Sequence, residues 1–297
     1  MQFGVVLPNF SRLGTREAQV ELAREAEALG YDSIWTTDHV MMAKGQEEPY
    51  GLILEALVTL AYLAPLTERV KLGASVIVLT QREPVLVAKQ AATIDYLSGG
   101  RLILGVGAGW NEREFGYLGA SFHDRGRRLE EYIRALRELW TSPDPRLEGQ
   151  YVHFSDVLFA PRPAQPNGPP IWIGGGSAAA LRRSAQMADG WHPVGASPEA
   201  VAAGMRRIGE LANGRRVEGT LRLRTAIGRT LPEQRGANGQ VQATLSGEPE
   251  ALIARVREYQ AAGVSHLLTH FGDNARDSFL EDMRRFAAEV RPGFQSG

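Results

Sequence analysis

The 297-residue chain contains no cysteine. This absence excludes disulfides, iron–sulfur clusters, zinc sites with cysteine ligands and a cysteine nucleophile. An excess of charge of one sign is also lacking, because 33 basic residues face 34 acidic ones. A chain without a basic excess has no overall field that would draw it to nucleic acid or to an anionic membrane. We therefore expect a small-molecule substrate as its partner, with no nucleic acid and no membrane.

Long hydrophobic runs and processing signals are missing as well. No apolar run approaches the roughly 18 residues that cross a bilayer. The start, MQFGVVLPNF, has no basic region followed by an apolar stretch of signal length, so we expect a cytoplasmic protein. The G-x-S-x-G and Walker A motifs are absent. The first predicted strand carries Val5-Val6-Leu7 where a zinc-dependent barrel hydrolase needs a His-x-His pair, and we expect no metal site.

What the chain does contain is a regular alternation of short apolar runs and amphipathic segments. The predicted strands cover residues 3–7, 33–36, 70–79, 101–107, 171–173, 190–194, 221–227 and 264–270. The predicted helices cover about 15–29, 52–64, 84–97, 124–140, 178–187, 198–211, 249–262 and 277–290. Eight strand–helix pairs predict an α/β fold, a (β/α)8 TIM barrel formed by one domain over residues 1–297.

Two further observations refine this fold. An open doubly wound sheet is the alternative, but PNFSRLG after the first strand is not a dinucleotide-binding fingerprint. Residues 141–170 are dense in proline, glycine and aromatics and interrupt the alternation before the fifth strand. We expect them to form an insertion with a short hairpin around 151–154, of the kind that often serves as an active-site lid.

A barrel brings the C-terminal ends of its strands to one mouth, so the residues there are candidates for a single pocket. They are Asn9, Asp38, His39, Ser75, Gly107, Ala108, Gly109, Trp110, Gly174, Gly175, Gly176, Ser177, His192 and His270. A histidine such as His39 can exchange a proton near neutral pH, or it can simply bond a backbone carbonyl. The glycines before Ser177 can cradle a phosphate at a helix N-terminus, or form a turn that Ser177 caps.

Four stretches together carry a family resemblance. They are Thr37-Asp38-His39, Leu72-Gly73-Ala74-Ser75-Val76, the segment GVGAGWNEREFGYLGASFHDRGRRLEEYIRALRELW from Gly105, and PPIWIGGGS before Ala178. With these stretches the chain resembles, nearly end to end, the luciferase-like monooxygenase superfamily. Within it, the chain is most similar to the branch of oxidoreductases that depend on the deazaflavin coenzyme F420. The resemblance implies a (β/α)8 barrel with an insertion.

The resemblance also assigns roles to individual positions. It implies that His39 donates a proton or orients hydride transfer, with Asp38 near the reactive ring. It implies a cis peptide between Ser75 and Val76 that backs the ring. The remaining implied cofactor contacts are Gly107, Ala108 and Gly109 beside the ring, and Gly175, Gly176 and Ser177 around the phosphate.

One departure bears on the substrate. Sugar-phosphate dehydrogenases of this branch carry a catalytic glutamate directly after the Gly-x-Gly turn, whereas this chain has Trp110 there and Glu112 as the nearest carboxylate in sequence. The departure argues against a sugar-phosphate substrate. We expect Trp110 to form an apolar wall of the substrate pocket, or else to pack under the insertion. Asn9 is a second candidate for contact with substrate.

The resulting hypothesis is an F420-dependent oxidoreductase that exchanges hydride with a small organic substrate. An FMN-dependent monooxygenase, fed by a separate flavin reductase and using oxygen, is the nearest alternative. We therefore expect a flavin or F420 reductase as the supplier of the cofactor. A flavin-binding protein without turnover is the third, because Trp110 replaces the expected acid. The apolar segment 52–66 further predicts a homodimer.

Overall fold

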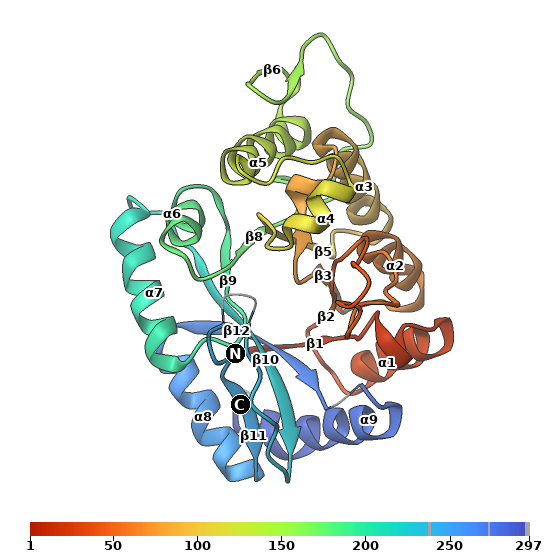
Figure 1. The fold of residues 1–297 in the computed structure, drawn as a ribbon, viewed down its shortest axis with the longest axis vertical. Coiled ribbons are helices and arrows are strands. Elements are labelled where there is room, and N and C mark those ends of the chain that lie inside the picture. Colours follow the sequence, from red (N-terminus) through yellow and green to blue (C-terminus); the bar gives the residue numbers. More distant parts are fainter. Residues whose placement is uncertain (237–238, 273, 295–297) are drawn as a thin grey trace.

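Eight parallel strands close into a barrel in the computed structural model, which describes residues 1–236, 239–272 and 274–294 (Figure 1). Each strand pairs with the next, and pairing of the last with the first completes the ring. The predicted (β/α)8 barrel is thus confirmed. The strands are β1 (Gln2–Val6), β2 (Ser33–Thr36), β3 (Lys71–Ala74), β5 (Leu102–Gly107), β8 (Ile171–Gly174), β9 (Gly190–His192), β10 (Glu218–Ile227) and β12 (Val264–Phe271).

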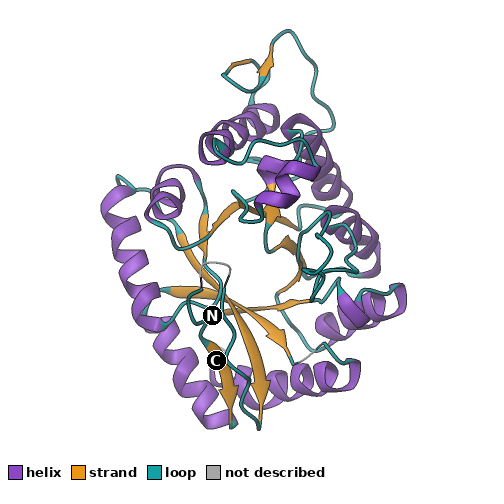
Figure 2. Cartoon of the chain, in the orientation of Figure 1, coloured by secondary structure: helices purple, strands orange, loops and turns teal. Residues whose placement is uncertain are grey.

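Helices surround this ring of strands (Figure 2). Local sequence signals set the two ends of the first helix. Thr15 Oγ1 accepts the N–H of Ala18 at 3.3 Å where the helix begins, and Gly30 adopts a φ of 78° just after the helix ends. In the described part of the chain, no helix combines the length and apolar content that a membrane crossing requires. The surrounding helices are α1 (Arg16–Ala28), α2 (Ala56–Leu63), α3 (Pro84–Leu97), α5 (Arg125–Thr141), α6 (Ala178–Met187), α7 (Pro198–Leu211), α8 (Pro249–Ala261) and α9 (Arg276–Arg285).

Two stacked tryptophans fill the barrel interior. The rings of Trp35 and Trp172 lie 4.8 Å apart at an interplanar angle of 22°, and both side chains are buried. Glycines make room for them, since a Cβ on Gly73 would lie 2.2 Å from Trp35 and a Cβ on Gly190 would lie 2.6 Å from Trp172. The interior is therefore a packed core, and space for a ligand lies at the mouth where the strands end.

The structure differs from the predicted elements in several places. The third strand, predicted over 70–79, is divided into β3 and β4 (Ile77–Val78), with a cis Ser75–Val76 peptide between them as the resemblance implied. The second helix begins at Ala56 rather than at residue 52, and Glu55 caps it through the N–H of Val58 at 2.7 Å. Two short elements were not predicted, namely α4 (Glu112–Tyr117) and β11 (Thr244–Gly247), which pairs with β10.

The insertion over 141–170 contains the expected hairpin, formed by β6 (Leu147–Glu148) and β7 (His153–Phe154). Its strands lie away from the barrel, beyond α5 (Figure 1). Backbone N–H groups of residues 150–152 bond Glu131 of α5, and Gln165 bonds Asp95 of α3. No described residue of the insertion lines the pocket at the mouth, so the expected lid contact is not seen.

Candidate active site

A cavity of about 1180 Å³ opens at the C-terminal ends of the barrel strands. Cavities of this size accommodate a ligand with several rings. The loops after β2, β3, β5, β8 and β9 supply its walls, and residues 233–236 and 242–243 after β10 close one side. The cavity brings together most of the predicted site residues, namely Asp38, His39, Ser75, Val76, Gly107, Ala108, Gly109, Trp110, Gly175 and Ser177.

His39, in the loop after β2, forms a buried pair with Glu114 of α4. Its Nδ1 lies 3.0 Å from Glu114 Oε2, while Oε1 accepts the backbone N–H groups of Val40 and Met41 at 2.6 and 3.2 Å. Burial alone would raise the pKa of Glu114, but the hydrogen bonds from His39 and the two N–H groups lower that pKa to about 2. Because an ionised carboxylate can only accept, His39 Nδ1 carries a proton.

This arrangement leaves His39 Nε2 as the atom that can exchange a proton with a ligand. The side chain lines the cavity, and within the described residues Nε2 has no hydrogen-bond partner. A carboxylate on the far nitrogen orients the ring and stabilises the imidazolium that forms when Nε2 takes up a proton. Sequence reasoning pointed to Glu112 as the nearest acid, but Glu112 is exposed and Glu114 is the one that meets His39.

Aromatic rings hold the His39 imidazole in place. The Tyr50 ring lies 4.6 Å from it, and the Trp110 ring lies 5.7 Å away at an angle of 81°. Trp110 is 53% exposed and lines the cavity, as a wall residue should. Its ring contact is with His39, at a cavity that no described residue of the insertion lines. The expectation of an apolar wall at Trp110 thus has a geometric basis, while contact with substrate stays a prediction.

Asp38 has a buried carboxylate whose two oxygens both serve the protein. Arg82 donates to them at 2.8 and 2.7 Å, and Oδ2 also accepts the N–H of Val78 at 2.8 Å. These bonds tie the end of β2 to β4. Asp38 lines the cavity, but its oxygens are already bonded, so the structure gives it a positioning role. Proximity to a cofactor ring stays a prediction.

The Ser75–Val76 bulge fits against glycines of the neighbouring strand β5. A Cβ on Gly105 would lie 2.0 Å from the Ala74 carbonyl oxygen, and one on Gly107 would lie 2.9 Å from a Val76 methyl group. Larger residues at these positions would displace the bulge. The glycine-rich run after Arg101 is therefore required by the close approach of backbone to the bulge, at the wall of the cavity.

A chain of hydrogen bonds fixes the Ser75 hydroxyl. Ser75 Oγ lies 2.9 Å from His192 Nε2, His192 Nδ1 lies 2.7 Å from Thr220 Oγ1, and Thr220 donates to the Trp191 carbonyl. Burial lowers the pKa of His192 to about 3, so its ring is neutral. The Thr220 hydroxyl donates its proton to the Trp191 carbonyl, so it accepts a hydrogen bond from His192 Nδ1. The other ring nitrogen, Nε2, then carries no proton and accepts a hydrogen bond from the Ser75 hydroxyl. The Ser75 oxygen can then accept a hydrogen bond from a ligand.

The loop between β8 and α6 has the form of an anion cradle. Ser177 caps α6 by accepting the N–H of Ala180 at 3.2 Å, and Trp191 Nε1 holds the Gly175 carbonyl at 2.7 Å. First-turn N–H groups of a helix lack intrahelical partners and favour anions. All three residues are exposed, and Gly175 and Ser177 line the cavity, whereas Gly176 is not part of its lining. That Gly175, Gly176 and Ser177 bind a phosphate stays a prediction. The capping of α6 by Ser177 is compatible with such a role.

Asn9 lies outside the cavity lining. Its amide donates to the carbonyls of Thr37 and Leu54 at 2.8 and 2.7 Å, and its Oδ1 accepts the N–H of Thr37 at 2.8 Å. The side chain is fully buried. All its bonding capacity is used to join the loops after β1 and β2, and we do not retain Asn9 as a substrate contact. The position of Asn9 after the first strand predicted a role at the mouth of the barrel. The sequence could not show whether the side chain joins two loops or contacts a ligand.

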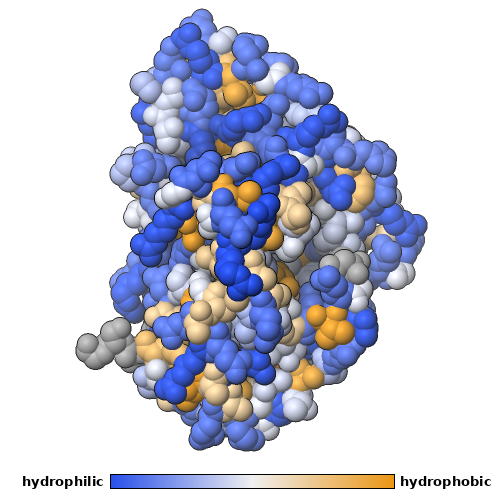
Figure 3. All heavy atoms as spheres, turned by 90° about the vertical axis from the view of Figure 1, so that its left-hand side faces the viewer, coloured by the Kyte–Doolittle hydropathy of each residue, from blue (hydrophilic) through white to orange (hydrophobic). Residues whose placement is uncertain are grey.

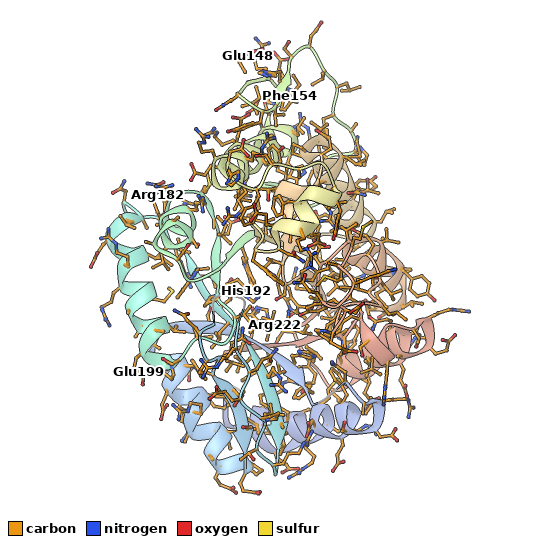
Figure 4. The ribbon with its side chains drawn as sticks, in the orientation of Figure 1. Glu148, Phe154, Arg182, His192, Glu199 and Arg222 are labelled. Carbon is orange, nitrogen blue, oxygen red and sulfur yellow. The ribbon has the colours of Figure 1, made fainter. Side chains whose placement is uncertain are left out.

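Sequence reasoning missed Arg222 on β10, whose side chain reaches across the barrel. Arg222 Nη1 donates to the Ser75 carbonyl at 3.0 Å and to Thr37 Oγ1 at 3.1 Å. Figure 4 shows Arg222 and His192 toward the centre of the barrel, whereas Arg182 lies on the outer helix α6. The available signal was the alternation Leu221-Arg222-Leu223-Arg224 within a predicted barrel strand, because strand residues two apart face the same side.

A (β/α)8 barrel with a histidine–carboxylate pair at its mouth is an architecture suited to acid–base chemistry on a bound ligand. The model of the luciferase-like monooxygenase family matches residues 1–233, and the chain belongs to this family. This confirms the resemblance found in the sequence.

Similar proteins include an F420-dependent glucose-6-phosphate dehydrogenase from Amycolatopsis mediterranei, 36% identical over 58% of this chain and 51% of its own length. The match thus spans about half of that relative. Among solved structures, monooxygenase RslO1 from Streptomyces bottropensis has a TM-score of 0.82 at 21% identity, over 99% of this chain and 100% of RslO1. An F420-dependent secondary alcohol dehydrogenase has a TM-score of 0.81 at 17% identity, over 99% of both chains. At these identities the structural likeness shows the fold alone.

Proposed function

We propose that this protein is an F420-dependent oxidoreductase that moves hydride between the deazaflavin and a small organic substrate. The His39–Glu114 pair is the observation that carries the proposal, because it places a proton-exchanging nitrogen at the wall of a large cavity. The F420 dependence named for the relative from Amycolatopsis mediterranei supports the choice of cofactor. The glycines beside the bulge give a further test of fit, since Gly107 and Gly174 line the cavity and present no side chains of their own there.

The residues that would hold the cofactor are those of the bulge and the two glycine-rich loops. They are Ser75, Val76, Gly107, Ala108, Gly109, Gly175 and Ser177, with Gly176 at the edge. When bound, the deazaflavin supplies a two-electron donor or acceptor of hydride. His39 Nε2 gives a proton to the substrate oxygen in the reducing direction and takes it back in the oxidising direction. Glu114 stabilises the charged imidazole, and Trp110 with Tyr50 excludes water from the substrate.

Turnover without oxygen tests this proposal. With oxygen excluded, purified protein and oxidised F420 are mixed with a panel of secondary alcohols, and reduction of the cofactor is followed by its absorbance. We expect F420 reduction that needs no oxygen and yields one ketone per cofactor reduced. No reduction with F420, together with product formation that requires reduced FMN and oxygen, would instead establish the alternative.

That alternative is an FMN-dependent monooxygenase supplied by a separate flavin reductase. The family to which the chain belongs, and its likeness in fold to monooxygenase RslO1, favour keeping it. The same His39–Glu114 pair would serve proton transfer in either case. A flavin-binding protein without turnover is less well supported, because Glu114 supplies the carboxylate whose loss at position 110 had motivated it.

We also infer a homodimer that uses α2. Val58 and Tyr62 of this helix are 63% and 42% exposed. The face over α6 and α7, on another side of the barrel, is mostly hydrophilic with separate apolar patches (Figure 3). Light scattering should give twice the chain mass, and Val58→Asp should halve it. A monomeric mass for the unmodified protein would refute this inference.

A further inference from the structure

The guanidinium of Arg222 is a buried positive charge at the wall of the cavity. Arg222 is 8% exposed, lines the cavity, and has no ion pair with any carboxylate in the described part of the chain. Its recorded acceptors are all neutral: the Ser75 carbonyl, Thr37 Oγ1, and His270 Nδ1 at 3.5 Å. A guanidinium has five N–H donors, so about two remain without a partner among the described residues.

Among the described residues, the carboxylates at or near the cavity are bonded to groups other than Arg222, and Glu233 of the lining pairs with Arg235. Both oxygens of Asp38 are bonded to Arg82 and β4, and Glu114 is bonded to His39. Burial lowers the pKa of His270 to about 3, with the positive charge of Arg222 adding to the effect, so its ring is neutral. Buried charges in proteins are normally paired, which makes an unpaired guanidinium facing a cavity a candidate site for a ligand anion.

The position of Arg222 limits where that anion would lie. Arg222 bonds Thr37, two residues before His39, so the guanidinium and the proton-exchanging imidazole share one wall of the cavity. A ligand that engages both groups needs an anionic group a few bonds from the oxygen that His39 protonates. A carboxylate next to a ketone or alcohol satisfies this requirement, and carboxylates match the planar fork of arginine.

We propose that Arg222 binds the carboxylate of the substrate, and that the substrates are short oxo acids and the corresponding hydroxy acids. This inference rests on the proposed hydride-transfer function. In the reducing direction the ketone carbon gains hydride from reduced deazaflavin, and the ketone oxygen gains the proton of His39 Nε2. The products are the hydroxy acid and the oxidised cofactor, and the carboxylate remains unchanged on Arg222.

The test compares two probes that differ only in the carboxylate, 2-oxobutanoate and butan-2-one. Both are offered with reduced F420, and kcat/KM is measured for the unmodified protein, Arg222→Met, Arg222→Lys and Arg182→Met. We expect the oxo acid to be favoured by about 10- to 100-fold, as for a charge-assisted hydrogen bond. Arg222→Met should bring this ratio near one, and Arg222→Lys should retain part of it. Arg182→Met, the same change on the outer helix α6 and outside the cavity lining, should preserve the ratio.

Three results would overturn the proposal. The first is a ratio near one in the unmodified protein, which needs no variant to fold. The second is an unchanged ratio in Arg222→Met. The third is a loss of F420 affinity in Arg222→Met with the ratio intact, which would place the anion on the cofactor. Binding of 2-oxobutanoate to the cofactor-free protein, measured by calorimetry, separates the two ideas: loss of that binding in Arg222→Met supports the anion site even if F420 is not the cofactor.

Discussion

Replacing Glu114 by glutamine should disable proton exchange at His39 while leaving the cavity intact. The carboxylate accepts from His39 on one oxygen and from two backbone N–H groups on the other. A glutamine has only one accepting oxygen, so its NH2 group must face a donor on one side. If the oxygen turns to the backbone, the NH2 group forces the His39 proton from Nδ1 to Nε2, and Nε2 can no longer accept.

The magnitude follows from the pKa of Glu114. Its fall from the ordinary 4.5 to about 2 corresponds to about 3 kcal/mol of preferential stabilisation of the ionised carboxylate, shared between His39 and the backbone. The part of this stabilisation that arises from the His39–Glu114 hydrogen bond is also available to the charged imidazole. Its loss in Glu114→Gln predicts a decrease of about 100-fold in kcat. An incorrect tautomer could extend the loss toward about 10⁴-fold.

Steady-state turnover of F420 with an alcohol substrate measures this effect. Glu112→Gln is the matched control, because Glu112 lies on the same short helix but is exposed. We expect Glu112→Gln to turn over within about twofold of the unmodified protein, and Glu114→Gln to bind F420 with little change in Kd. Equal turnover by the two variants would refute the role given to the His39–Glu114 pair.

Three further outcomes are expected. His39→Ala should reduce turnover about 100-fold or more with F420 affinity within a few fold; unchanged turnover would leave His39 a loop histidine. Burial lowers the pKa of His192, His266 and His270 to about 3 in the folded protein. As pH falls below about 6.5, these histidines therefore bind protons in the unfolded chain but not in the folded one. The free energy of unfolding then decreases by about 1.4 kcal/mol per histidine per pH unit. The melting temperature by scanning calorimetry should therefore fall steeply from pH 6.5 to 5, and equal values at pH 7.5 and 5 would contradict this. Gly107→Ala places a Cβ 2.9 Å from the bulge and should weaken F420 binding about tenfold in a fluorescence titration, where an unchanged Kd would show that the bulge does not contact the cofactor.

The barrel could be predicted because each strand–helix unit has its own local sequence signals. Apolar runs of strand length, helical spacing of apolar residues and punctuating glycines repeat along the chain, and closure of eight parallel strands follows from their number. The elements that escaped prediction are short: α4 has six residues and β11 has four. Such segments are set by contacts with the rest of the fold rather than by their own periodicity.

The candidate site was only partly predictable for a related reason. His39 stands directly after a strand, where topology alone places it at the mouth. Its partner Glu114 is 75 positions away, and only the path of the unpredicted helix α4 brings the two together. Arg222 was visible as an arginine in a barrel strand, but that no carboxylate of the described residues pairs with it is a property of three-dimensional packing. The sequence pattern likewise could not reveal that Asn9 joins two loops.

Parallel titration of the cofactor-free protein with F420 and with FMN, followed by cofactor fluorescence, tests the central claim most directly. The proposal of an F420-dependent oxidoreductase predicts tight binding of F420 and weak binding of FMN. Tight binding of FMN with weak binding of F420 would contradict it and would point to an oxygen-dependent monooxygenase that requires a separate flavin reductase.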